Sequence, residues 1–182
     1  GFDKNGIALD AISKLGFGFI EIGAVTPLPQ PGNPKPRAFR IKSENAIINH
    51  YGFNNDGMVK INERLAKFAK KSVVGLNIGA NKKSIKMTSD FTKVLKHCAQ
   101  NVHFASINIS SPNTTNLRSL QRKEKLQELL SSVTECNNNL ATPKPIFVKV
   151  SPDLEIKQLE DIVTLTTEYD LAGIIATNTT TD

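Results

Sequence analysis

Five apolar, β-branched-rich runs recur along the 182-residue chain, and longer amphipathic segments separate them. The runs, predicted as strands, are residues 17–25, 73–78, 102–109, 146–150 and 171–176. The segments predicted as helices are residues 5–15, 57–71, 84–97, 119–136 and 154–169. Strands that are apolar almost throughout and alternate with helices predict a parallel sheet covered by helices. The chain is therefore predicted to be an α/β protein, either a doubly wound sheet or a β/α barrel.

The glycines near the first run bear on that choice. A doubly wound nucleotide-binding fold normally has a glycine-rich phosphate loop between its first strand and the following helix. Gly16 and Gly18 lie before or at the start of the first run, and Gly23 lies within it. They do not occupy a strand-to-helix turn, and no P-loop sequence is present. The barrel is the favoured reading.

One connection is much longer than the others. Residues 26–56 contain five of the nine prolines, at positions 27, 29, 31, 34 and 36. A connection of this length within a compact domain is usually functional or disordered. Prolines stiffen the backbone, and residues 46–48 (AII) offer apolar side chains to bury. We expect an ordered excursion over the strand ends.

Composition excludes several classes of protein. Hydrophobic content of 39%, charged content of 22% and the chain length indicate one globular domain over residues 1–182. The net charge of +6 comes from scattered lysines, and aromatic residues make up 6% with no Trp, so no nucleic-acid partner is expected. Two cysteines exclude a disulfide framework or a cysteine-rich zinc site, and the three histidines show no ligand spacing. No metal is expected.

Polar or small residues stand where the apolar runs end. They are Gly23, Ala24, Asn77, Asn108, Lys149, Thr177 and Asn178. In a β/α barrel the strand ends and the loops that follow them form the active site. Asparagine also caps helices, which is the structural alternative. Asn or Lys at four successive strand ends favours a polar pocket over capping.

The segment 107–116 (INISSPNTTN) holds two serines and three asparagines without a charge. Such a cluster suits a neutral, amide-rich ligand. Ser111 lacks the surroundings of a nucleophilic serine, and His103 precedes it within a predicted strand. Two interpretations of Ser111 remain: a general base with a proton path, or a turn serine beside Pro112.

Seven motifs together identify a family resemblance. They are GFDKNG (1–6), GFGFIEIGAVTPLPQPGNPKPRAFR (16–40), INHYGFNNDG (48–57), GLNIGANK (75–82), NISSPNTTNLR (108–118), VKVSPD (148–153) and GIIATNTT (173–180). With them the chain resembles the quinone-dependent, membrane-associated (class 2) dihydroorotate dehydrogenases over essentially its whole length. The soluble class 1 branch carries cysteine where Ser111 stands and lacks the YGFN form of residues 51–54.

The resemblance implies a (β/α)8 TIM barrel that binds FMN and oxidises (S)-dihydroorotate to orotate, with ubiquinone as electron acceptor, in pyrimidine (UMP) biosynthesis. It implies that Ser111 is the catalytic base. The implied substrate-binding residues are Lys4, Asn49, Tyr51, Gly52, Phe53, Asn108, Asn113, Asn178 and Thr179. The implied cofactor-binding residues are Gly1, Lys4, Gly23, Ala24, Asn77, Asn108, Lys149 and Thr177. Ala38 and Arg40 match the quinone entrance.

The resemblance also marks departures. Ala24 stands where relatives often carry a hydroxyl residue near the flavin. The chain is expected to run from the end of strand 1, at residues 1–4, through strand 6. An N-terminal helical lid that contacts the membrane and the last two strands with their phosphate sites are expected in the remainder of the same polypeptide. The implied location is the mitochondrial inner membrane in a eukaryote, or the cytoplasmic face of the inner membrane in a bacterium.

Three alternatives remain. One is a class 1 dihydroorotate dehydrogenase. Another is a tRNA dihydrouridine synthase, a related FMN barrel that uses a cysteine acid, although neither Cys98 nor Cys136 lies at a predicted strand end. The last is a non-catalytic fragment.

Overall fold

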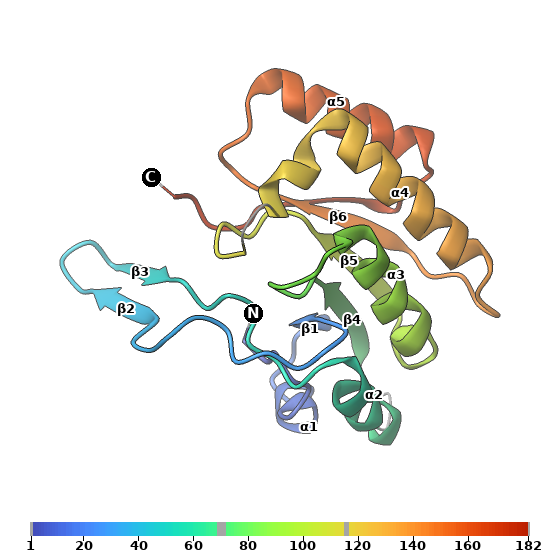
Figure 1. The fold of residues 1–182 in the computed structure, drawn as a ribbon. Helices are drawn as coiled ribbons and strands as arrows, with labels where there is room; N and C mark the ends of the chain where they lie inside the picture. The colour runs from blue at the N-terminus through green and yellow to red at the C-terminus, as the bar shows by residue number, and fades with distance from the viewer. Residues whose placement is uncertain (1, 69–71, 115–116, 182) are drawn as a thin grey trace.

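A parallel sheet forms the centre of the computed structural model, which describes residues 2–68, 72–114 and 117–181. Its five strands are β1 (Phe19–Val25), β4 (Val73–Ile78), β5 (Phe104–Asn108), β6 (Ile146–Val150) and β7 (Gly173–Ala176). They pair in chain order, β1-β4-β5-β6-β7, and every pairing is parallel. The order never reverses, as it would in a doubly wound sheet. The predicted α/β class and the succession of a barrel wall are confirmed (Figure 1).

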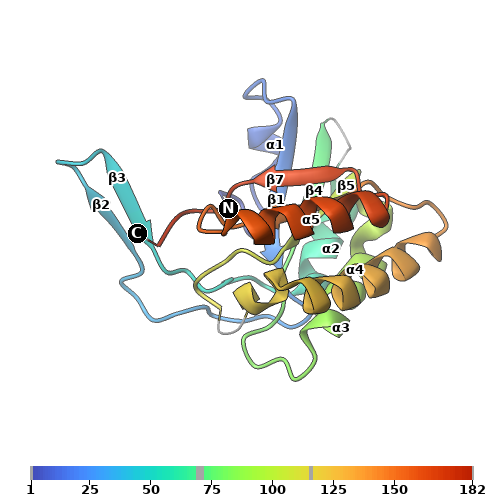
Figure 2. The same ribbon diagram turned by 90° about the horizontal axis from the view of Figure 1, so that it is seen from above.

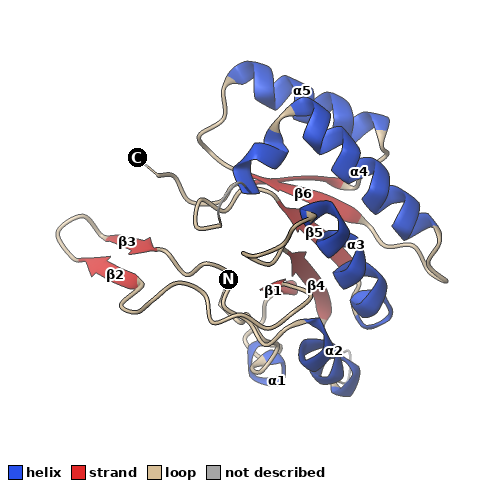
Figure 3. Cartoon of the chain, viewed as in Figure 1, coloured by secondary structure: helices blue, strands red, loops and turns tan. Residues whose placement is uncertain are grey.

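Helices line one face of this sheet. They are α2 (Met58–Lys67), α3 (Met87–Cys98), α4 (Lys123–Asn138) and α5 (Ile156–Glu168), and each packs against the next (Figure 3). Their apolar faces meet the outward side chains of the strands, and the buried core lies between these layers. Phe91 of α3, Leu129 of α4 and Ile107 of β5 are fully buried there.

The opposite face of the sheet carries a different set of side chains. Phe19, Phe104 and Phe147 make edge-to-face contacts across it, with ring centroids 5.7 Å and 5.5 Å apart. A Cβ on Gly75 would overlap the Phe104 ring, so this glycine makes room for the aromatic row. Successive side chains of a strand alternate between faces. Residues two positions further on, such as Lys149 after Phe147, therefore face the same interior nearer the carboxyl ends.

The helices differ from the prediction at the start of the chain. Instead of spanning residues 5–15, α1 covers Leu9–Ile12. The Asp3 carboxylate accepts hydrogen bonds from the backbone N–H groups of Asn5, Ile7 and Ala8 and holds them in a loop. Gly6 has a φ of 65° within this loop, which a helix does not allow.

Two other helical predictions change in detail. The predicted helix at 119–136 is divided into a 3₁₀ turn, η2 (Leu117–Gln121), and α4. A second 3₁₀ turn, η1 (Ala99–Asn101), extends α3. Residues 69–71 of the predicted helix 57–71 lie outside the described residues.

Residues 1–4 were expected to be the end of an earlier strand, but the described residues 2–4 are not in a strand. This segment is joined to β1 by the hydrogen bond that Gly23 N donates to Asp3 O at 3.1 Å. No helix in the described ranges combines the length and apolar character needed to cross a membrane.

The long connection at 26–56 contains an antiparallel hairpin, β2 (Ala38–Ile41) and β3 (Ala46–Asn49). In both views the hairpin projects away from the sheet and the helices (Figures 1 and 2). The expectation that residues 46–48 are buried is wrong, because Ile47 is 64% exposed and Ile48 is 54% exposed. A two-stranded ribbon has no third layer to cover its faces.

The base of this connection is held by side chains. Asn55 accepts a hydrogen bond from Thr26 N, at 3.2 Å, and donates to Thr26 Oγ1 at 2.8 Å. Asn81, in the loop after β4, donates to Thr26 Oγ1 and to Gln30 Oε1. These bonds tie both ends of the excursion to the carboxyl side of the sheet.

Candidate active site

A continuous chain of hydrogen bonds joins four strands at their carboxyl ends. Asn178, after β7, donates from Nδ2 to Ser110 Oγ at 2.9 Å. Ser110 Oγ donates to Asn108 Oδ1 at 3.0 Å. Asn108 Nδ2 donates to Asn77 Oδ1 at 2.9 Å, and Asn77 Nδ2 donates to Glu21 Oε2 at 3.1 Å. The predicted convergence of the asparagines into one polar floor is thereby observed.

All donors in this chain point in one direction, toward the Glu21 carboxylate. Ser106 Oγ donates to the other oxygen of the same carboxylate. An ionised carboxylate only accepts hydrogen bonds, so it fixes which way the neighbouring amides face. Each asparagine in the chain keeps a second amide hydrogen that these bonds do not use. The polar floor therefore holds uncharged amide donors in set orientations.

Sequence reasoning missed Glu21 and Ser110. The signal for Glu21 was present, since it is the charged residue within the otherwise apolar run 17–25. Ser110 offered no such signal, because it differs from Ser111 only in which way its side chain faces. Ser110 is fully buried in the chain of hydrogen bonds.

Ser111 lies beside this floor and is 6% exposed. Its Oγ accepts a hydrogen bond from Asn113 N at 3.3 Å, and Asn113 Nδ2 donates to Asn49 O at 3.4 Å. Among the described residues, no histidine or carboxylate is hydrogen-bonded to the Ser111 hydroxyl. His103 Nδ1 instead accepts from Val74 N at 3.0 Å. A serine–histidine nucleophile is therefore excluded in this part of the chain.

Two cations lie over the Tyr51 ring, in the long connection. Lys4 Nζ lies 4.8 Å from the centroid of the Tyr51 ring, and Arg37 Cζ lies 5.7 Å from it. Burial, then the charges of Arg37 and Lys149, lower the pKa of Lys4 below its ordinary value of 10.5. Each of these influences disfavours the ammonium form, so the site gains by binding an anion there. Sequence reasoning missed Arg37, which donates to Pro31 O and Asn33 O within the proline-rich segment.

Two glycines allow close packing next to the floor. Gly23 has a φ of 110°, and a Cβ there would strike the carbonyl oxygen of Asn77. A Cβ on Gly79 would overlap the Phe53 ring and lie within 3.3 Å of the Ala24 Cβ. The ends of β1 and β4 are therefore close together, with Gly23, Ala24 and Gly79 all buried.

Comparison with known proteins decides the family. The sequence model of the family described as "Dihydroorotate dehydrogenase" matches residues 1–182. The chain belongs to the dihydroorotate dehydrogenase family. It is 49% identical, over 181 residues, to a Cereibacter sphaeroides protein named "Dihydroorotate dehydrogenase (quinone)". It is 46% identical, over 185 residues, to a mitochondrial protein of that name from Cyclocybe aegerita.

Solved structures from this dihydroorotate dehydrogenase family agree. DHODH from Eimeria tenella in complex with ferulenol superposes with a TM-score of 0.94 at 35% identity, covering 100% of this chain and 55% of that one. The ligand-free form gives the same TM-score. The two sequence relatives are matched over 99% of this chain but only 51% and 56% of their own length. The chain thus spans about half the length of the dihydroorotate dehydrogenases it matches.

The residues expected from the family resemblance fall into three groups. Hydrogen bonds, charge interactions, close contacts or strand pairing connect most of them to the polar floor: Lys4, Gly23, Asn49, Asn77, Asn108, Ser111, Asn113, Lys149, Asn178 and Thr179. Tyr51 lies against Lys4, and Ala24 and Phe53 lie beside Gly79, whereas Gly52 lies against Asn33 in the long connection. Thr177 and Thr179 are exposed at the rim, where Thr179 N donates to Asn178 Oδ1 at 2.8 Å. Ala38 and Arg40 are exposed on β2, where Ala38 pairs with Asn49 and Arg40 pairs with Ile47, further from the floor. Gly1 lies outside the described residues.

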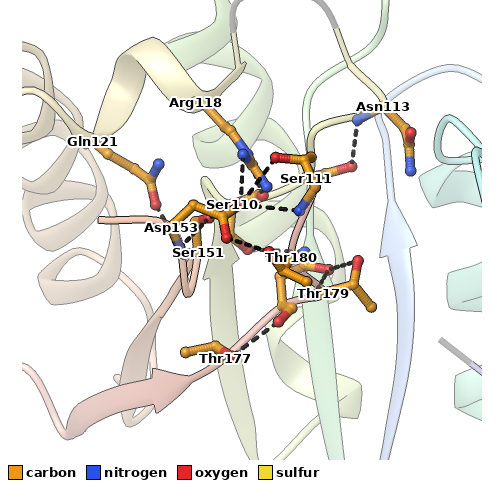
Figure 4. A network of polar contacts seen from close by, with 12 residues as sticks. Ser110, Ser111, Asn113, Arg118, Gln121, Ser151, Asp153, Thr177, Thr179 and Thr180 are labelled. Atoms are coloured by element: carbon orange, nitrogen blue, oxygen red, sulfur yellow. Dashed lines mark hydrogen bonds and ion pairs between the residues drawn. The ribbon is translucent and has the colours of Figure 1, made fainter. Parts of the chain in front are cut away.

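A second polar network borders the floor (Figure 4). It is built on Arg118 of η2 and Asp153, in the loop after β6, whose side chains form an ion pair at 3.0 Å. Both residues lie in motifs that supported the resemblance, but sequence reasoning gave neither a role.

Proposed function

We propose that the complete polypeptide carrying this chain is a quinone-dependent dihydroorotate dehydrogenase of pyrimidine biosynthesis. It oxidises (S)-dihydroorotate to orotate and passes the electrons to ubiquinone. The observation that carries this proposal is the joining of an uncharged amide floor, a buried serine and a cation cluster at one end of the sheet. The names of the closely similar relatives support the same reaction.

The proposed substrate matches this combination of groups. Dihydroorotate carries ring amide and imide groups and one carboxylate. Asn49, Asn108, Asn113 and Asn178 offer amides that pair with such edges, and Thr179 adds a hydroxyl. Lys4, beside Arg37, meets the carboxylate. Phe53, Tyr51 and Gly52 cover the ring from the long connection.

Ser111 is the proposed base that removes the proton at C5. A neutral hydroxyl is a weak base, so this role requires a water-poor site and a path that relays the proton onward. The burial of Ser111 supplies the first condition. The hydrogen bond from Asn113 N fixes its oxygen, so a lone pair can be held toward the substrate carbon.

The same end of the sheet suits a flavin, which we propose is FMN. Gly23 and Ala24 are the proposed small residues beside the ring, and Asn77, Asn108, Thr177 and Lys4 are the proposed polar contacts to its edge. Lys149 would favour the negative charge that accumulates on a reduced flavin. Gly1 is the remaining proposed contact. When bound, the flavin would accept the hydride that leaves C6.

The hairpin is the proposed route of the quinone. Ala38 and Arg40 lie on β2, a strand of the hairpin in the long connection, and this hairpin projects away from the sheet. We further propose that residues 1–182 are part of a single barrel domain, whose remaining strands and N-terminal membrane-contacting helices lie elsewhere in the same polypeptide. An inner membrane is the proposed location, mitochondrial or bacterial.

Steady-state turnover with different acceptors tests the function. The complete polypeptide should form orotate with a ubiquinone analogue, and much more slowly with fumarate or NAD⁺. Faster turnover with fumarate or NAD⁺ would instead indicate class 1 chemistry, and no orotate with any acceptor would refute the proposal.

A further inference from the structure

We propose that Arg118 and Asp153 are positioning residues that set the serine loop against the segment after β7. The serine loop is defined here as residues 109–114, and the β7 segment as residues 177–181. The inference rests on the proposed function, because these two stretches supply the proposed base and several substrate contacts. It assigns roles to two residues for which the family resemblance implies no contact with substrate or flavin.

Arg118 connects the loop after β5 to the loop after β6, and it uses a different nitrogen atom for each. Its Nη1 lies 3.0 Å from Asp153 Oδ2, and its Nε donates to Ser110 O at 3.2 Å. The planar guanidinium holds its donors at fixed angles, so both partners are placed relative to each other. Lysine, with a single charged nitrogen, cannot reproduce both contacts. Figure 4 shows the side chain reaching from η2 toward both groups.

Asp153 extends the connection to the β7 segment. Its Oδ1 accepts from Thr180 Oγ1 at 2.6 Å, and its Oδ2 accepts from Thr181 N and Oγ1, both at 3.2 Å. The Thr180 hydroxyl above all, together with Thr181 and Arg118, holds the pKa of Asp153 below its ordinary value. The carboxylate therefore stays ionised at neutral pH and keeps its partners.

Ser110 is where the connections meet. Its carbonyl is held by Arg118, and its hydroxyl is held by Asn178 Nδ2. Ser111 is the next residue, so a displacement of Ser110 moves the proposed base directly. Ser110, Arg118, Asp153 and Thr180 are joined by consecutive contacts, and the backbone from Thr180 back to Asn178, which donates to Ser110, closes the ring between the loops after β5, β6 and β7.

This pair differs from an ordinary surface ion pair in the groups that it contacts rather than in its burial, because Asp153 is itself an exposed residue. The side chains of Arg118 and Asp153 are 27% and 20% exposed, and Arg118 Nη2 is buried without a hydrogen-bond partner in the described ranges. Lys123 and Asp161 form a matched comparison, since they pair at 3.5 Å between α4 and α5 and touch no strand end. Exposed pairs of that kind contribute little.

The test compares variants of the complete polypeptide in the two half-reactions. Arg118→Ala and Asp153→Asn should slow flavin reduction by dihydroorotate roughly 10-fold to 100-fold, because small displacements of a base have large effects. Flavin content and reoxidation by a ubiquinone analogue should match the parent. Arg118→Lys should recover part of the loss, and Lys123→Ala should behave as the parent.

Two outcomes would overturn the proposal. Flavin reduction in Arg118→Ala and Asp153→Asn could equal that of Lys123→Ala. Both half-reactions could fall by the same factor, which indicates a general structural role. If Arg118→Ala does not fold, Asp153→Asn and Thr180→Val, which remove one partner each, decide the question by the same criteria.

Amide hydrogen exchange separates this proposal from the proposed function, because it needs no substrate. Asp153→Asn should raise exchange in the serine loop and the β7 segment, whereas Lys123→Ala should not. Unchanged exchange would contradict the positioning role even in an active enzyme. A parent protein that does not oxidise dihydroorotate would refute the function, and the exchange result would still stand.

Discussion

Asn108 Nδ2 donates a hydrogen bond to Asn77 Oδ1 at 2.9 Å, which joins the ends of β5 and β4 through their side chains. Both side chains are almost fully buried. Two buried amides in contact satisfy each other and hold their remaining hydrogen atoms in fixed directions. The polar floor depends on this contact. It connects the hydrogen bonds that start at Asn178 to the hydrogen bonds that end at Glu21.

Replacing Asn108 by alanine should break the floor in the middle. We expect orotate to bind at least about 10-fold more weakly, and the free energy of unfolding to fall by about 1–3 kcal/mol because Asn77 Oδ1 loses its donor. Isothermal titration with orotate and denaturant unfolding measure these effects.

Asn101→Ala is the matched control for that substitution. Asn101 Nδ2 donates to Asn62 Oδ1 at 2.8 Å, which is also an Asn–Asn contact but one between η1 and α2. It should leave orotate binding unchanged. Equal weakening of orotate binding by both substitutions would show that Asn108 acts only through overall stability.

Lys4→Met should stabilise the ligand-free protein while weakening the binding of anions. Lys4 has a lower pKa when folded than its ordinary 10.5, so folding with the charge in place is unfavourable below the folded pKa, including at pH 7. That cost shrinks as the pH rises from the folded pKa toward 10.5 and disappears above 10.5, where Lys4 is neutral in both states. The variant's higher unfolding temperature should therefore be clear at pH 7 and shrink by pH 10.

Thermal unfolding at both pH values, with orotate titration at pH 7, checks the Lys4 prediction. Lys67→Met, on the exposed side of α2, is the control and should change neither quantity. A lower unfolding temperature for Lys4→Met, or undiminished orotate affinity, would contradict the assignment of Lys4 to the anion.

Arg40→Ala should affect the quinone half-reaction more than the substrate half-reaction. Arg40 is exposed on the hairpin, apart from the amide floor, so its loss should leave flavin reduction by dihydroorotate intact. Stopped-flow reoxidation by a ubiquinone analogue should slow or require more quinone. Equal losses in both half-reactions would refute the quinone assignment.

The cysteines should have no part in the reaction. Burial raises the pKa of the Cys98 thiol to about 12, and burial also raises that of Cys136. Thiolate is the reactive form, so Cys98 should resist alkylation at pH 8 until the protein is unfolded. Peptide mass spectrometry measures the labelling. Rapid labelling of native Cys98 with loss of activity would contradict this prediction and support the alternative in which a cysteine acts as the acid, as in the dihydrouridine synthases.

The sheet could be predicted from the sequence because its strands carry apolar side chains on both faces, and strands of that kind have long apolar runs. Asn77 and Asn108 were recognisable because each interrupts such a run near its end. Glu21 was equally visible but was not interpreted, since a lone charge in a strand has no stated partner. Its partners, Asn77 and Ser106, lie 56 and 85 residues away.

Other features depend on distances that a sequence does not reveal. In the sequence, nothing distinguishes Arg118 and Asp153 from other loop and turn residues. Only the fold of η2 places the Arg118 guanidinium against both the Ser110 carbonyl and the Asp153 carboxylate. Ile47 and Ile48 were wrongly predicted to be buried, because an exposed hairpin strand and a buried strand can have the same local sequence pattern. The loop at residues 5–8 likewise follows from one side chain, Asp3, which competes with helix formation.

The most direct test of the account is anaerobic mixing of the flavin-loaded complete polypeptide with dihydroorotate. The flavin absorption band should bleach in the parent and recover on addition of a ubiquinone analogue. In Ser111→Ala the flavin should remain bound, but its bleaching should slow by roughly 10²-fold or more, because the proposed base is lost. Bleaching at the parent's rate in Ser111→Ala, or none in the parent, would contradict the account.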